Sequence, residues 1–345
     1  SNTATPDAVE ALIQRLGYAN TESSPNASRT LGLRVSDGDG GASTPNVLTI
    51  NVTPQEDGTP KAYGEEQVNT YVPNSQSDAA VAKLSGGGYV VVWNSSSAQD
   101  GSADGVYAQR YSGSGVAVGP EFRVNTTTSN SQYDPAVVGL SDGSFVVAWT
   151  DNAADGSSEG VFAQRFDSAG VALGSQFAVN TYTNSNQAQP KIAAYAGGFV
   201  ATWYSYGEDN YGHGVYSQRF DNAGVKSGGE IQVSSDFASY QYEPDVAARA
   251  DGSFVIVYRS DQTQDGSGVG VYAQRFDSAG AKLGSEFLVN TTTANSQYQP
   301  RVAMLSDGDF VVVWYDDGGQ DGSGGAVFGQ RFNSDGTMDG SQFRV

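Results

Sequence analysis

Apolar and polar positions along this chain follow a pattern that repeats about every 55 residues. A segment that mixes Val and aromatic residues, 270–276, occurs in five versions, and each is followed by a Gly-rich turn. Its Gln-Arg-aromatic triplet begins at positions separated by 55, 54, 56 and 56 residues: Gln109, Gln164, Gln218, Gln274 and Gln330. A constant period of this length indicates a repeat architecture. No repeated residue is therefore chemically unique by default.

Each repeat predicts four strands. The first follows or contains a proline, as in 135–140, and a Ser-Asp-Gly hairpin turn at 141–143 leads to the second. The second is a near-continuous apolar run such as 310–314, and a long polar loop separates it from the third, 270–276. Residues 286–290 are typical of the fourth strand. Four antiparallel strands with a fully buried second strand favour a propeller blade.

Two strands support this interpretation independently. In each repeat, the second strand ends in an aromatic residue: Trp93, Trp149, Trp203, Tyr258 and Trp314. Burying one such side chain is worth about 2–3 kcal/mol. The first strand is rich in small residues, which lets inner strands crowd a narrow axis. We therefore predict an all-β fold in which residues 58–345 form a five-bladed β-propeller of four-stranded antiparallel blades. A closed ring is favoured over an open stack, because an open stack leaves its end faces exposed.

The fourth-strand sequence occurs six times, once more than the other three. One copy, 66–70, precedes the first repeat, and another, 341–345, ends the chain. Either copy could complete the last blade, and truncation from a longer array is a third alternative. The sequence leaves these alternatives open.

Residues 1–57 do not follow the repeat. Thr5 and Pro6 form a helix start signal, and apolar residues at helical spacing then predict a short helix that Gly17 closes. Alternating apolar residues near 31–35 and 48–52 predict two strands. One helix and two strands cannot bury both faces of a sheet. The segment resembles the C-terminal part of the cadherin-like or Ig-like modules of giant secreted bacterial proteins, on residues 29–31, 35–41 and 48–53.

Charge and cysteine usage narrow the classes of partner. The 345 residues include 18 Lys and Arg against 38 Asp and Glu, for a net charge of −20, and no Cys. Such a surface repels phosphate backbones and anionic lipids, so we expect no nucleic-acid partner and no membrane insertion. No apolar run reaches the length of a membrane span. The acidic surface favours cations, and the oligomeric state stays open.

Acidic pairs four residues apart in the loop after the second strand are candidate calcium ligands. Each second Asp begins an Asp-Gly-Ser sequence, and calcium takes six to eight oxygens, which carboxylates, hydroxyls and carbonyls supply. The pairs are Asp151 with Asp155, Asp261 with Asp265, and Asp317 with Asp321. The alternative is that Asp-Gly is simply good turn chemistry.

Amide and phenol groups near the start of each first strand are candidate ligand-binding residues. A Gln occupies this place in every repeat, and three repeats add a Tyr: Gln76, Gln132, Gln187, Gln241, Gln297, Tyr133, Tyr242 and Tyr298. Around the mouth of a closed ring, such groups suit a sugar or a peptide. The alternative is structural, with Gln bonded to the backbone and Tyr packed between blades.

The remaining polar motifs indicate no catalytic site. The repeated Arg (Arg110, Arg165, Arg219, Arg275 and Arg331) suits pairing between blades better than reading an anion. His213 is the single histidine, and no nucleophile motif or phosphate loop accompanies it. Some propellers are glycosidases that use Asp and Glu from different blades. The third repeat departs most from the others, at 204–209, and is where a special site would lie.

The repeat resembles tandem repeats of RTX-type or cadherin-like adhesins, which are very large secreted bacterial proteins. The carriers are 265–280 and the Phe-x-Val-Asn-Thr sequence that follows it, as at 287–291. The resemblance implies secretion or a bacterial cell-surface location, extracellular calcium and a role in adhesion. The expected function is thus a non-catalytic, calcium-stabilised binding or spacer module with an extracellular glycan or protein ligand. The alternative is a carbohydrate-active propeller, lectin-like or a glycoside hydrolase.

Overall fold

The computed structural model describes residues 67–96, 99–152, 154–209, 211–235, 240–261, 266, 268–319 and 324–345. The chain divides into two compact units, Ser1–Gln67 and Val68–Val345. The described residues belong to the second unit, apart from Gln67. The helix and strands predicted within 1–57 lie outside the described residues. None of the described residues forms a helix that could span a membrane.

Five four-stranded antiparallel sheets make up the second unit, each formed by four consecutive strands. The first sheet holds β1 (Gln76–Lys83), β2 (Tyr89–Ser95), β3 (Gly105–Tyr111) and β4 (Phe122–Arg123). The second holds β5 (Gln132–Gly139), β6 (Phe145–Asn152), β7 (Glu159–Phe166) and β8 (Phe177–Ala178). The third holds β9 (Gln187–Tyr195), β10 (Gly198–Tyr206), β11 (His213–Asp221) and β12 (Ile231–Gln232). The fourth holds β13 (Gln241–Ala248), β14 (Phe254–Ser260), β15 (Gly270–Phe276) and β16 (Phe287–Leu288). The fifth holds β17 (Gln297–Met304), β18 (Phe310–Asp316), β19 (Ala326–Phe332) and β20 (Met338–Arg344).

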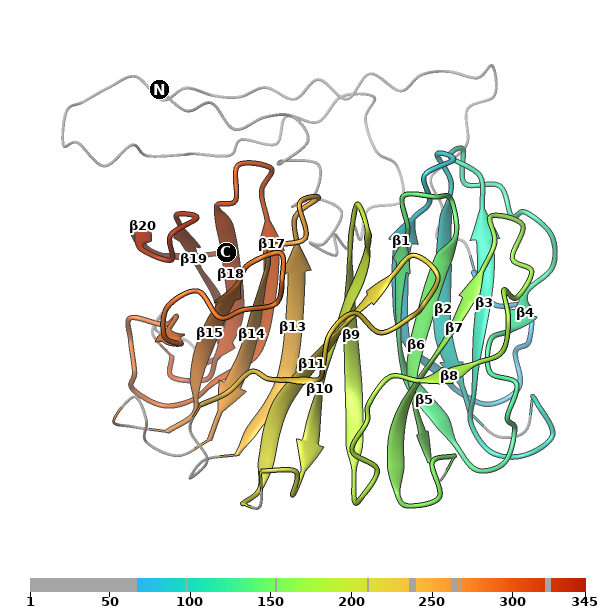
Figure 1. The fold of residues 1–345 in the computed structure, drawn as a ribbon, viewed down its shortest axis with the longest axis horizontal. Coiled ribbons are helices and arrows are strands. Elements are labelled where there is room, and N and C mark those ends of the chain that lie inside the picture. The colour runs from blue at the N-terminus through green and yellow to red at the C-terminus, as the bar shows by residue number, and fades with distance from the viewer. Residues whose placement is uncertain are drawn as a thin grey trace. The chain divides into compact units, whose positions relative to one another are not determined.

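These sheets are the blades of a five-bladed propeller, as the repeat predicts. They follow one another in chain order, from the blue first sheet to the red fifth sheet (Figure 1). The first strand of each blade contacts the first strand of the next, from β1 through β5, β9 and β13 to β17. We call these five the inner strands.

Four hydrophobic clusters fill the four interfaces between successive blades. In the first, Val90 and Val92 of one blade pack against Phe145 and Trp149 of the next. Phe145 also stacks on Phe166, with ring centroids 5.1 Å apart. The aromatic residues that close the second strands are 0–3% exposed, so the prediction of an inter-blade core is confirmed.

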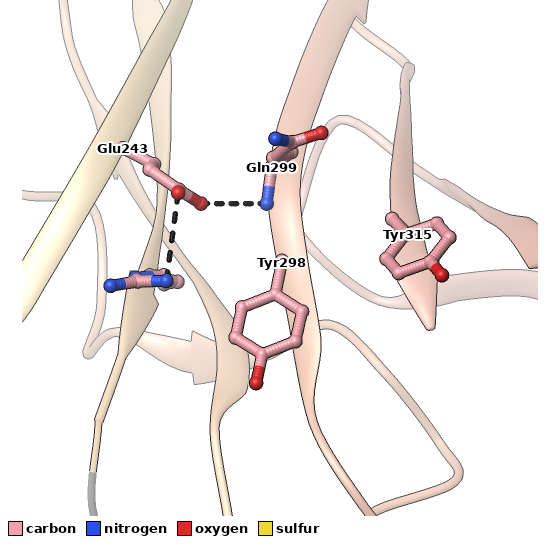
Figure 2. Close-up of a pocket in the computed structure, with 5 residues that line it drawn as sticks. Glu243, Tyr298, Gln299 and Tyr315 are labelled. Carbon is pink, nitrogen blue, oxygen red and sulfur yellow. Dashed lines mark hydrogen bonds and ion pairs between the residues drawn. The ribbon is translucent and has the colours of Figure 1, made fainter. Parts of the chain in front are cut away.

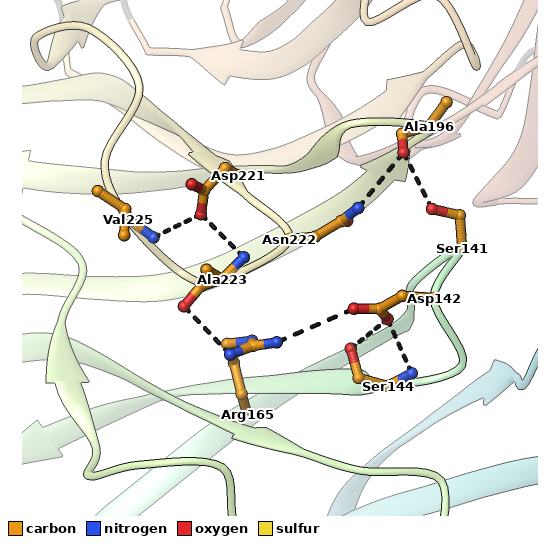
Figure 3. Close-up of polar contacts among 9 residues, drawn as sticks. All are labelled: Ser141, Asp142, Ser144, Arg165, Ala196, Asp221, Asn222, Ala223 and Val225. Atoms are coloured by element: carbon orange, nitrogen blue, oxygen red, sulfur yellow. Dashed lines mark hydrogen bonds and ion pairs between the residues drawn. The ribbon is translucent and has the colours of Figure 1, made fainter.

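The repeated arginine links neighbouring blades. Arg165 Nη1 donates to the carbonyl of Ala223 at 3.1 Å, and Nη2 lies 4.0 Å from Asp142 (Figure 3). Arg110 donates in the same way to Ser168, and Arg275 to Asp335. The structural role expected for the arginine is therefore confirmed at these three positions.

One face of blade 5 is less covered by a neighbouring blade than the corresponding faces of the other blades are. Within the described residues, β17 and β1 make no contact as broad as those between other inner strands. Val327 is 41% exposed, whereas the equivalent valines of the other blades are fully buried: Val106, Val161, Val215 and Val271. Arg331 pairs with Asp339 of its own blade at 3.1 Å. We call this face of blade 5 the seam face.

The fourth-strand copy at the end of the chain completes the fifth blade. Strand β20 pairs with β19, through Phe328 with Arg344 and Gly329 with Phe343. Residues 67–70 lie ahead of β1, outside any strand. Of the two rival copies, the C-terminal one therefore occupies the outer position in blade 5.

Candidate functional site

Every inner strand is interrupted by a bulge near its start. The third residue of each strand has a left-handed backbone, with φ between 52° and 56°: Asp78, Asp134, Gln189, Glu243 and Gln299. The pairing register with the second strand shifts at or beside this residue. Such a conformation is unfavourable for residues other than Gly, and it concentrates at functional sites. The bulge thus places one acidic or amide residue at the same position along the first strand of each blade.

Charged residues from all five inner strands interact next to these bulges. Lys191 on β9 feels the charges of Arg301, Asp245, Asp134 and Asp78, one from each of the other inner strands. Burial, with the help of Arg301, lowers the pKa of Lys191, and burial raises the pKa of Asp134. We call these five residues the inner-strand cluster. Titratable groups of shifted pKa, such as Lys191 and Asp134, that meet other charges in one place are typical of functional sites.

A hollow of about 330 Å³ adjoins the bulges of blades 4 and 5. It is lined by Glu243, Arg259, Tyr298, Gln299 and Tyr315 (Figure 2). Glu243 accepts a hydrogen bond from the Gln299 backbone N–H at 2.7 Å and pairs with Arg259 at 3.5 Å. The Arg259 guanidinium also lies over the rings of Tyr242, at 4.9 Å, and Tyr298, at 5.5 Å. These contacts hold the wall of the hollow in one arrangement.

His213 lies among four tyrosines in blades 3 and 4. Its ring centroid is 4.5 Å from that of Tyr242, 4.8 Å from Tyr206, 5.2 Å from Tyr204 and 5.8 Å from Tyr240. Burial lowers the pKa of His213, so the imidazole is neutral at pH 7. The histidine therefore serves here as one more ring of an aromatic group.

The candidate glutamines begin the inner strands, and their amides are engaged within the fold. Gln132 is fully buried; its Oε1 accepts from Asn125 Nδ2 at 2.8 Å and its Nε2 donates to the Ser129 carbonyl at 2.9 Å. Gln76, Gln187 and Gln297 repeat this arrangement with an Asn of the preceding linker. Gln241 is equally buried, but a Ser stands in place of that Asn. This geometry corresponds to the structural alternative weighed for the glutamines.

The three candidate tyrosines lie beside the bulges. Tyr133 donates its hydroxyl to Glu159, and burial with this bond raises the pKa of Tyr133. Tyr242 contacts His213 and Arg259, whereas Tyr298 lines the hollow. The tyrosines are thus in a position to meet a ligand, and the glutamines beside them form the support.

The candidate calcium ligands do not occupy equivalent positions in their blades. Asp151 pairs with Gln132 at the start of β5. In blades 4 and 5, the residues that pair with the equivalent Gln are Ser260 and Asp316, so Asp261 and Asp317 lie one residue further along the chain. Burial raises the pKa of Asp151 to about 6. Asp155 accepts from the Ser157 backbone N–H at 3.0 Å, as a turn residue does.

Asp265 and Asp321 lie outside the described residues. Among those that the structure describes, no three His, Asp or Glu side chains gather as a metal site requires. Calcium binding remains a prediction.

Blade 3 carries a carboxyl pair that the sequence did not reveal. Glu208 follows β10 and interacts with Glu230, whose Oε2 accepts from the Thr181 N–H at 2.7 Å. Burial and Glu230 raise the pKa of Glu208 to about 9, so the pair retains a proton at neutral pH. In blade 1, Gln99 donates to Glu121 at 2.7 Å instead. The pair therefore replaces an amide–carboxylate bond found elsewhere in the repeat.

The inner-strand cluster cannot be found from the residues that the repeats share. The signal for it lies at the positions where the repeats differ. The third and fifth residues of the inner strands change from blade to blade, and the fifth residues are Ala80, Ala136, Lys191, Asp245 and Arg301. Because the blade fold does not require one particular residue at these positions, their side chains are free to bind a ligand.

Comparisons with known proteins support the fold. No family model matches the chain, and a search of curated proteins finds no match either. A protein of unknown function from Dyadobacter fermentans is similar with a TM-score of 0.52 and 11% identity, over 78% of this chain and 82% of that one. An α-L-arabinanase from Penicillium chrysogenum, solved with arabinobiose, is similar with a TM-score of 0.50 and 12% identity, over 80% of this chain and 95% of that one.

The expected function needs correction at this point. The sequence predicted a non-catalytic adhesion or spacer module, whereas the named neighbour with this fold is the propeller of an arabinanase. The solved structures with this fold therefore do not support the non-catalytic module. The fold is one that an enzyme uses, and an identity of 12% supports no closer statement.

Proposed function

We propose that this chain is a carbohydrate-active propeller that binds a glycan at the bulged ends of its inner strands and hydrolyses it. One observation carries the proposal: the inner-strand cluster, with three carboxyl groups, adjoins tyrosines of neighbouring blades. Carboxyl groups supply acid–base chemistry, and tyrosine rings stack on sugar rings. The similarity in fold to an arabinanase agrees with this combination.

Asp134 is the proposed proton donor. Glycoside hydrolysis commonly needs one protonated carboxyl group and a second, ionised one. Burial raises the pKa of Asp134, and Asp78 and Glu159 raise it further, whereas Lys191 opposes them. Asp78 is exposed and acts on Asp134, so it is the proposed second carboxyl group. The protein would thus hold one more buried and one exposed carboxyl group beside one another.

A lectin-like role is the second candidate. Arg301 and Lys191 lie among the carboxyl groups, and such pairing also suits a site that only binds sugar hydroxyls. A secreted or cell-surface location, which the resemblance to adhesin repeats implies, suits both roles because polysaccharides are extracellular ligands.

Hydrolysis and binding assays on the same polysaccharides test the proposal. The chain should release reducing ends from at least one of a panel of plant and microbial polysaccharides. Asp134→Asn should abolish release and retain binding, since Asn tolerates a left-handed backbone and keeps the shape. Asp307→Asn, in the turn beyond the opposite end of β17, is the matched control and should remain active. Binding without release would support the lectin-like role, and the absence of both would refute the proposal.

A further inference from the structure

Aromatic and guanidinium groups form a continuous row across blades 3, 4 and 5. From Tyr206 the row passes to His213 at 4.8 Å and on to Tyr242 at 4.5 Å. Arg259 follows at 4.9 Å from Tyr242, and Tyr298 lies 5.5 Å from Arg259. Tyr240 flanks the row at His213, and Tyr315 lines the hollow beside Tyr298. We call these seven residues the tyrosine track.

Successive blades build the track from cross-strand pairs. Tyr206 pairs with His213 in blade 3, Tyr242 with Arg259 in blade 4, and Tyr298 with Tyr315 in blade 5. Blade 1 has Ser77 opposite Asn94 at the level of the blade 4 and 5 pairs. The blade fold therefore does not need aromatic residues at these positions.

The track remains open to solvent although it is apolar. Tyr206 is 45% exposed, Tyr240 42% and Tyr315 40%. Large aromatic side chains that remain exposed in a row mark a binding surface, because burying them on a ligand is favourable. Their mutual contacts hold the rings before a ligand arrives, which lowers the entropy that binding must overcome.

The charges around the track select against anionic ligands. Asp78 and Glu159 both act on Asp134 on the side of blades 1 and 2, and the whole chain has a net charge of −20. These charges disfavour a polyanion such as a uronate polymer. Arg259, in the middle of the track, is paired with Glu243 at 3.5 Å and Asp261 at 3.6 Å, so it adds no net positive charge there. An uncharged glycan avoids the repulsion that a polyanion meets.

We propose that the tyrosine track binds several consecutive sugar units of an uncharged polysaccharide that extends from the inner-strand cluster across blades 3 to 5. This inference rests on the proposed function and adds its substrate class, a neutral polymer bound along its length. The apolar faces of sugar rings stack on tyrosine rings, whereas the Arg259 guanidinium donates to sugar hydroxyls. Ring-to-ring contacts of 4.5–4.8 Å in blades 3 and 4 and the guanidinium contacts of 4.9–5.5 Å that continue them to blade 5 make the track long enough for several sugar units.

Binding measurements with the full chain test the track separately from the proposed function. The probes are soluble arabinan, xylan and β-glucan as neutral polymers, polygalacturonate as a charged one, and a disaccharide from each neutral polymer. Tyr206→Ala and Tyr240→Ala should each weaken binding of the preferred neutral polymer about two- to tenfold, since one stacked ring is worth about 0.5–1.5 kcal/mol. Disaccharide binding at the cluster should change little.

The matched control is Phe343→Ala, which removes an aromatic side chain that is 42% exposed on the outer strand of blade 5. It should leave polymer affinity unchanged, and thermal unfolding should show that the tyrosine variants fold. If a neutral polymer binds equally well to both tyrosine variants, the track is refuted and the proposed function stands. Tighter binding of polygalacturonate would also refute it. If no polymer is bound or cleaved, the proposed function fails with it.

Discussion

The glutamine at the start of each inner strand shows how a repeated polar residue becomes part of the scaffold. Its side chain connects the strand to the linker from the preceding blade, as Gln132 does through Asn125 and Ser129. A buried amide that satisfies two partners has little left to offer a ligand. Tyr133, one residue further along, varies among the blades and faces the bulge region instead.

Replacement of Gln132 by Ala should destabilise the protein by about 2–3 kcal/mol, because it removes one of the acceptors of the buried Asn125 amide and the donor to the Ser129 carbonyl. Gln76→Ala is the matched comparison. Gln76 makes the same two bonds but is only half-buried, so its replacement should cost less. Urea unfolding of the two variants measures the difference, and equal losses would contradict the structural role assigned to burial.

Replacement of Glu208 by Gln should stabilise the protein above about pH 5. The folded-state pKa of Glu208, about 9, is far above the ordinary value for Glu, so the native protein holds a proton that the unfolded chain releases. Stability is therefore lost as the pH rises from about 4.5 towards 9, and the variant removes this loss. Its amide can donate to Glu230 as Gln99 does to Glu121, which is worth about 1 kcal/mol. Melting temperatures at pH 4 and pH 8 test this: a gain at pH 4 only would contradict it.

At the level of strands, the sequence predicted what local pattern determines. The alternation within the second and third strands and the Asp-Gly turns between strands are local properties, and the five sheets follow them. The loop after the second strand could not be aligned by spacing alone. Blade 2 has a shorter loop, so the Asp151 and Asp261 that seemed equivalent differ in register by one residue.

The fourth strands differ in whether their aromatic residue packs against the next blade. Phe177 packs on Phe220 of the next blade, with centroids 5.7 Å apart, whereas Phe343 lies against Gly329 of its own blade. Phe177→Ala should therefore cost about 3 kcal/mol of stability, and Phe343→Ala less than about 1 kcal/mol. Equilibrium denaturation of both variants decides it. A similar loss in both would mean that the seam face is covered in solution.

On the scale of the whole molecule, the inner-strand cluster depends on how the blades are placed around one another. Asp78 and Arg301 are more than 200 residues apart in the sequence, yet both act on Lys191. No local pattern encodes that meeting, because it follows from the accumulated rotation of four packed interfaces. The sequence could therefore predict the blades and the aromatic residues, but not which charges converge.

The unequal carboxyl groups of the cluster predict a pH dependence of cleavage. As the proposed donor, Asp134 must be protonated, and burial holds its pKa above that of an ordinary aspartate. Activity should therefore fall as the pH rises through that raised pKa. Asp134→Asn should abolish the activity, whereas Asp307→Asn should show the same fall in activity with rising pH as the unaltered protein. A rate that is independent of pH on the alkaline side would exclude Asp134 as the donor.

The exposed seam face affects where the protein begins to unfold. In the described part of the chain, blades 1 and 5 each pack broadly on only one neighbouring blade, and such an end repeat opens at a lower free energy than a repeat held on both sides. Backbone amides of β18 and β19 should accordingly exchange with deuterium faster than those of β10 and β11, which lie between two packed interfaces. A protease should nick the end blades first and leave blades 2 to 4 as a resistant core. The tyrosine track spans blades 3 to 5, so a long glycan bound along it would fasten blade 5 to the more stable central blades.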